Sequence, residues 1–109
     1  MIDISFKGGV KPKGIKLETI RGLVVCAAVF RDYGKRFTVT SLNDGRHMRG
    51  SKHYSGEGWD ARSRDEAPGY AQWSDDEKRH IAQACRNRLG KDYDVVVESN
   101  HFHFEYDPK

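Results

Sequence analysis

The sequence predicts an α+β domain in which two main helices pack on a small antiparallel sheet. Apolar residues at three- and four-residue steps predict helices over residues 17–33 and 75–89. Alternating and β-branched segments predict strands over residues 36–42, 93–98 and 101–106. Because no repeat or linker interrupts the 109 residues, we expect one domain spanning residues 1–109.

Signals at the helix ends support these assignments. Residues 6–14 are rich in Gly, Pro and Lys, and predict an irregular entry to the first helix. Apolar side chains on most faces of this helix predict a central, buried position, and Gly34 ends it. Ser74 and Glu77 match a capping box at the start of the second helix, which Gly90 ends.

The segments between the helices are more irregular. Residues 43–57 predict a long loop, because they hold glycines, serines and histidines without an apolar period. Residues 58–62 (GWDAR) then predict a short strand. The link at residues 99–100 is short enough to allow either a hairpin or one bent strand.

Composition excludes some classes of protein and leaves others open. Apolar residues make up 37% of the chain and charged residues 32%, which is typical of a globular protein and not of a disordered or fibrous one. The chain shows no secretory pattern and no apolar run long enough to cross a membrane, so we expect synthesis in a cytoplasm. Cys26 and Cys85 lie among apolar neighbours in the helices, which favours two buried, reduced thiols.

Four of the five histidines fall into two clusters along the chain. The first cluster lies in the long loop and includes His53. Asp60 follows seven residues later, and Gly56 and Gly58 let the chain turn between them. On a strand, Asp60 faces away from Trp59, so we expect the carboxylate to point to a site and the indole to the core.

The second cluster has strand geometry. His101, His103 and Glu105 alternate with three aromatic residues, Phe102, Phe104 and Tyr106. One face of the strand would therefore anchor in the core while the histidines face a cleft. Two histidines and one aspartate, with a fourth position left to water, form a catalytic type of Zn²⁺ shell.

The string from Ser51 to Asp60 fits the pattern SxHxxGxGxD, and HxH follows after a helix and a strand. In this order of motifs the chain resembles the zinc peptidases that trim peptidoglycan stem peptides. These include D-Ala-D-Ala carboxypeptidases, L-alanyl-D-glutamate endopeptidases and phage endolysins, and the hedgehog signalling domain shares their fold. The resemblance covers about residues 14–108 and implies a hedgehog- or DD-peptidase-like fold.

The resemblance also implies roles for individual residues. His53 and Asp60 would be metal ligands, and the second histidine of the HxH pair, His103, would be the third. His101 would then stabilise the oxyanion near the metal-bound water. Arg49, with Arg46 as the alternative, would hold substrate or oxyanion.

The general base is where this sequence departs from the resemblance. Several relatives carry an acid three residues before the ligand, and here that position is Asn100, which cannot accept a proton. Glu98 is the nearest acid, and it lies three residues before His101 and five before His103. We expect His103 as ligand and Glu98 as base, while strand alternation alone leaves His101 open as the ligand.

Three functions follow, in order of preference. The first is a zinc peptidase that cleaves peptidoglycan stem peptides, as a phage endolysin released to the cell wall would do. The second is a non-catalytic zinc- or partner-binding domain of the same fold. The third is a nucleic-acid binder, suggested by five basic residues: Arg46, Arg49, Lys52, Arg62 and Arg64. Acidic residues interrupt this basic set, so no nucleic-acid or membrane partner is expected, and the cleaved bond and oligomeric state stay open.

Overall fold

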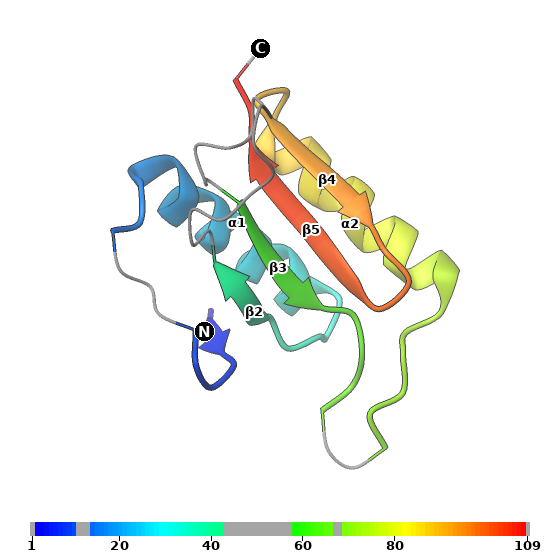
Figure 1. Cartoon of the computed structure of the whole chain (residues 1–109). Coiled ribbons are helices and arrows are strands. Elements are labelled where there is room, and N and C mark those ends of the chain that lie inside the picture. The colour runs from blue at the N-terminus through cyan, green and yellow to red at the C-terminus, as the bar shows by residue number, and fades with distance from the viewer. Residues whose placement is uncertain (1, 11–13, 43–57, 67–68, 109) are drawn as a thin grey trace.

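The computed structural model describes residues 2–10, 14–42, 58–66 and 69–108. Along the described chain the elements are β1 (Ser5–Phe6), α1 (Leu17–Asp32), β2 (Thr38–Leu42), β3 (Gly58–Arg62), α2 (Asp75–Leu89), β4 (Tyr93–Val97) and β5 (His101–Tyr106). The strands form one sheet in the order β1-β2-β3-β5-β4, and Figure 1 shows both helices behind it. The α+β class predicted from the sequence is confirmed.

The sheet is mixed, and the prediction of a wholly antiparallel sheet is wrong at one edge. β1 pairs in parallel with β2, where Ser5 donates its backbone N–H to the Phe37 carbonyl at 3.0 Å. Helix α1 connects these two strands, and a crossover of that kind brings the chain back in the same direction. The other strand pairs are antiparallel.

The link between β4 and β5 is a hairpin, one of the two alternatives that the sequence left open. Val97 pairs with Phe102, and the Glu98 backbone N–H donates to the His101 carbonyl at 2.9 Å. Strand β5 also pairs with β3, so the histidine strand lies inside the sheet with a hydrogen-bonded neighbour on each side.

Aromatic side chains fill the core between the helices and one face of the sheet. Trp59 on β3 stacks on Phe104 of β5 with ring centroids 5.3 Å apart. Phe30 of α1 contacts Phe102 edge to face at 5.4 Å. All four are almost fully buried, so strands β3 and β5 are fixed from the core side.

Helix α1 is buried on one side only, which limits the prediction of a central, buried helix. Leu17, Ile20 and Val24 are 74%, 46% and 47% exposed. The same helix buries Cys26 and Phe30 completely, since they face the sheet and α2. Apolar composition alone therefore overstated how far α1 is enclosed.

Helix α2 has the ends predicted for it. The Ser74 hydroxyl accepts a hydrogen bond from the Glu77 backbone N–H at 3.1 Å, and Gly90 follows the last turn with a positive φ. Cys85 on this helix and Cys26 on α1 are both buried and free, as expected. Within the described ranges, neither helix is long and apolar enough to span a membrane.

Candidate metal site

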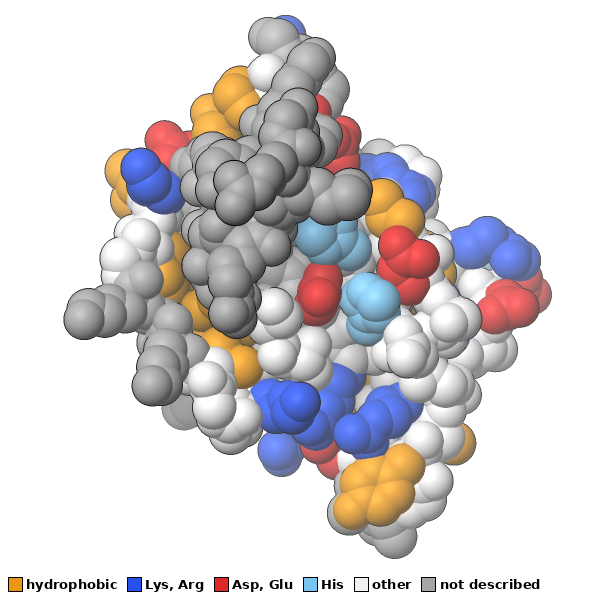
Figure 2. All heavy atoms as spheres, viewed as in Figure 1, with side chains coloured by type: hydrophobic (Ala, Val, Ile, Leu, Met, Phe, Trp, Pro, Cys, Tyr) orange, Lys and Arg blue, Asp and Glu red, His pale blue; other side chains and the backbone are white. Residues whose placement is uncertain are grey.

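The face of the sheet opposite the helices carries the candidate site. Cross-strand register pairs Asp60 with His103, and Arg62 with His101, so these four side chains lie on one face. Glu105 extends the same row on β5. In Figure 2, histidines and acidic side chains gather near the middle of this face, with Lys and Arg side chains next to them.

Asp60 and His103 are in direct contact. The His103 Nδ1 atom lies 2.7 Å from Asp60 Oδ1, although 43 residues separate them in the sequence. Because β3 and β5 place them opposite each other, backbone pairing fixes the contact, and it does not depend on a loop.

Glu105 holds the other side of the His103 ring. Its Oε1 atom lies 3.0 Å from His103 Nε2, and the residue is buried. Both ring nitrogens can donate to these carboxylates only when the imidazole carries two protons. The hydrogen bond to Asp60, opposed by burial, accordingly raises the pKa of His103 above its ordinary value.

The sequence placed Glu105 on the histidine face without giving it a role. A carboxylate on the second ring nitrogen of a metal-binding histidine fixes the orientation and tautomer of the ring. The signal for this role was present in the alternation of HFHFEY, where Glu105 stands two residues beyond His103. On a strand, that spacing makes them neighbours on one face.

His101 lies beside this pair but is held differently. Its Nε2 atom is 4.0 Å from Asp60 Oδ1, beyond hydrogen-bond distance. Its Nδ1 atom is 2.8 Å from Asn100 Oδ1 and donates to that amide oxygen. The remaining nitrogen, Nε2, therefore faces Asp60, and His101 lies next to the Asp60–His103 pair without joining it.

Glu98 ends the β4 side of the hairpin, next to the candidate site. Its side chain is exposed, and its negative charge contributes to the raised pKa of His103. The hairpin therefore brings an ionised carboxylate into the electrostatic environment of the metal-ligand candidates. Lys78 of α2 anchors this turn, donating from Nζ to the Ser99 carbonyl at 3.0 Å.

The structure gives a steric reason for Gly58, the second glycine of the SxHxxGxGxD pattern. A Cβ built on Gly58 would lie 3.0 Å from the Phe104 carbonyl oxygen and 3.6 Å from the His103 ring. The absence of a side chain there lets β3 and β5 approach closely beside Asp60.

Several predicted site residues lie outside the described residues. These are His53, expected as the first ligand, and Arg49 and Arg46, expected to hold substrate or oxyanion. In the part of the chain that is described, no three His, Cys, Asp or Glu side chains are grouped to hold a metal ion. The described structure thus supplies two adjacent donors, Asp60 and His103.

These two donors fit the chemistry of zinc. Imidazole nitrogen and carboxylate oxygen are both common zinc ligands, and a structural or catalytic shell needs at least one more donor. The carboxylate of Glu105 behind His103 is the outer partner that such a ligand usually has. The sequence pattern offers His53, which lies outside the described residues, as the third donor.

No family model, no curated protein and no solved structure matches the chain.

Proposed function

We propose that this chain is a zinc-dependent peptidase that hydrolyses a peptide bond in peptidoglycan stem peptides. The observation that carries the proposal is the 2.7 Å contact between Asp60 and His103, two donors that the sequence pattern assigns to one metal shell. The order of helices and strands, with the histidine strand paired to the aspartate strand, supports the hedgehog- or DD-peptidase-like fold in the same proposal.

Each residue has a distinct task in this proposal. Asp60 and His103 hold the ion together with His53, and Glu105 keeps the His103 ring in place through Nε2. A bound zinc ion would acidify water and polarise a carbonyl. The Glu98 carboxylate accepts the proton of the attacking water, and His101, beside Asp60, would stabilise the developing negative oxygen, as the sequence pattern implies.

The proposed setting is a lysis enzyme of phage type. Its substrate would be a stem peptide of the bacterial wall, reached after release from the cytoplasm in which the chain is made. Arg49 would steady the substrate or its oxyanion, as the sequence pattern suggests.

Mass spectrometry of defined muropeptides tests this function. The zinc-loaded protein should release one new product, EDTA should abolish it, and added zinc should restore it. His53→Ala should lose the product as well. His80→Ala is the matched control, because His80 is an exposed residue on α2, behind the sheet. Undiminished cleavage by the His53 variant would contradict the proposal.

A non-catalytic zinc-binding domain is the second candidate. Asn100 favours it, because this amide occupies the position expected for the base and bonds to His101 Nδ1. In that case zinc would bind, and Asp60→Ala would weaken its binding, yet no muropeptide would be cut. Direct zinc titration alongside the digestion therefore separates the two candidates.

A further inference from the structure

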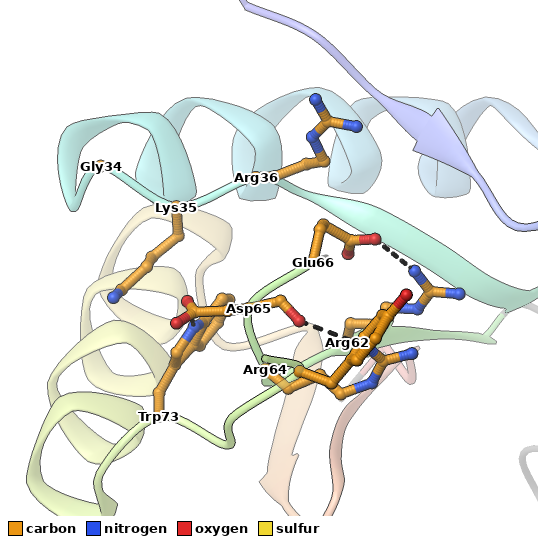
Figure 3. Close-up of a pocket in the computed structure, with 9 residues that line it drawn as sticks. Gly34, Lys35, Arg36, Arg62, Arg64, Asp65, Glu66 and Trp73 are labelled. Carbon is orange, nitrogen blue, oxygen red and sulfur yellow. Dashed lines mark hydrogen bonds and ion pairs between the residues drawn. The ribbon is translucent and has the colours of Figure 1, made fainter. Parts of the chain in front are cut away.

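A polar pocket of about 630 Å³ opens at the end of β3, beside the candidate metal site. Its charged lining has four cations and two anions: Lys35, Arg36, Arg62, Arg64, Asp65 and Glu66. Figure 3 shows the Arg62 and Arg64 side chains extending toward the same side, whereas Arg36 points away from Glu66. The lining therefore carries more positive than negative charge.

Arg62 and Arg64 continue the row that contains Asp60. Residues two apart on an extended chain face the same way, and Ser63 between the two arginines is fully buried. The backbone remains extended at Arg64, because this residue forms an isolated antiparallel β-bridge with Gln72. At about 3.3 Å per residue, Arg62 and Arg64 lie about 7 and about 13 Å along the chain from Asp60.

The two arginines differ in how they are held. Arg62 forms an ion pair with Glu66, whose Oε1 lies 2.5 Å from a guanidinium nitrogen. Arg64 lies over the Tyr70 ring at 4.9 Å and donates to the Asp65 carbonyl at 3.2 Å. Among the described residues no carboxylate pairs with Arg64, and its hydrogen bond to the Asp65 carbonyl uses one of its five N–H donors.

We propose that Arg62 and Arg64 form a subsite for a free carboxylate of the substrate, located two to four residues from the bond that is cut. An extended peptide advances about 3.3 Å per residue, so the distance along β3 sets this separation. The planar guanidinium of Arg64 binds a carboxylate through two parallel hydrogen bonds. The inference rests on the proposed function and narrows its substrates to acidic peptides.

In a stem peptide, the α-carboxylate of the γ-linked D-glutamate is such a group. Placing it at the Arg62 end of the subsite, about 7 Å along the chain from Asp60, puts the metal-ligand residues about two residues away, near the bond that follows the fourth residue. The L-alanyl-D-glutamate bond adjoins the D-glutamate directly and would lie outside this spacing.

The test compares two pentapeptides, L-Ala-γ-D-Glu-L-Lys-D-Ala-D-Ala and the same peptide with the D-Glu α-carboxylate converted to the amide. The wild-type protein should prefer the acid peptide by about tenfold in kcat/KM, as expected for a lost charge-assisted hydrogen bond. Arg64→Gln should reduce this preference to about one, because the variant lacks the guanidinium that distinguishes the acid from the amide. Arg79→Gln, on the exposed side of α2, is the matched control and should keep the preference.

Calorimetric titration of the same peptides separates this inference from the function on which it rests. If no peptide is cut but the acid peptide binds about tenfold more tightly in an Arg64-dependent way, the subsite stands and the peptidase proposal fails. Equal binding of both peptides by the wild-type protein would overturn the subsite. So would Arg64→Gln weakening the binding of a single-stranded oligonucleotide while both peptides bind equally.

Discussion

At the scale of single residues, His103 is the centre of the candidate site. Carboxylates lie on both sides of its ring, Asp60 at Nδ1 and Glu105 at Nε2. A metal ion bound beside Asp60 would replace the proton at Nδ1 and leave the Nε2 hydrogen bond intact. Glu105 is therefore positioned to orient the His103 ring both in the metal-free protein and with a metal ion bound.

Substitution of Glu105 should weaken zinc binding. In Glu105→Gln the ring loses the charged partner that fixes its tautomer, and loss of such partners typically costs about 10- to 100-fold in metal affinity. Competition with a chromogenic chelator measures the affinity directly. Wild-type affinity in this variant would show that Glu105 does not orient the ligand.

Glu98→Gln is the informative comparison. Like Glu105→Gln, this substitution replaces a carboxylate with an amide. Here, however, we expect the protein to keep its zinc affinity. Muropeptide cleavage should fall by about 10²- to 10⁴-fold, the range for a lost general base. The opposite pattern, lost zinc binding with Glu98→Gln, would make Glu98 a ligand.

The Asp60–His103 pair also predicts a pH dependence for the metal-free protein. Asp60 raises the folded-state pKa of His103 above the unfolded value of about 6.5. The contribution of the Asp60–His103 pair to the free energy of unfolding is therefore fully present below the unfolded-state pKa of His103. It is lost as the pH rises through the folded-state pKa of His103. Asp60→Asn should lower the His103 pKa in an NMR titration. An unchanged value would contradict the assigned cause.

At the scale of secondary structure, the contact between α1 and β3 fixes the candidate site from behind. Gly22 of α1 packs on the Trp59 ring, and a Cβ built there would lie 2.2 Å from the indole Cη2. Trp59 is buried and stacked on Phe104, so it has little freedom to move away. Trp59 also directly precedes Asp60, so this packing restrains the part of β3 that carries the Asp60 side chain.

Gly22→Ala should therefore destabilise the protein. Alanine favours the helix by about 1 kcal/mol over glycine, but overpacking of a filled core costs about 1–3 kcal/mol and the clash here is with a rigid ring. We therefore expect urea unfolding to give a lower free energy of unfolding for Gly22→Ala than for the wild-type protein. Gly8→Ala is the control, because a Cβ at Gly8 meets nothing within 4 Å. Equal stability of the two variants would show that Trp59 can shift.

At the scale of the whole molecule, one core joins both helices to the sheet. Cys26 and Cys85 contribute to it from different helices, and both are fully buried. Burial, with Cys85 beside it, raises the pKa of the Cys26 thiol well above its ordinary value. Because both thiols are buried, neither is accessible to a reagent while the protein is folded.

A thiol reagent should accordingly report on unfolding. We expect Ellman's reagent to modify the two cysteines slowly in the native protein and at once in denaturant, because both side chains are buried until the protein unfolds. The modification rate should rise with urea in parallel with the loss of circular dichroism. Rapid modification in the absence of denaturant would indicate that α1 and α2 open locally.

Patterns within a few residues were sufficient to predict much of this molecule. Alternation predicted the HFHFEY strand and its two faces, and the Ser74 cap predicted the start of α2. The placement of Asp60 and His103 on the face away from the core also follows from alternation. Such signals act locally, through side-chain direction and backbone hydrogen bonds, so the sequence alone determines them.

The tertiary structure decided which of these residues meet. Asp60 lies opposite His103 because β3 pairs with β5 in one register, and a shift of one residue would turn every side chain to the other face. The parallel β1 edge, the exposed side of α1 and the position of Arg64 near the site depend in the same way on distant segments. No local pattern encodes these contacts, because they arise from the packing energy of the whole core.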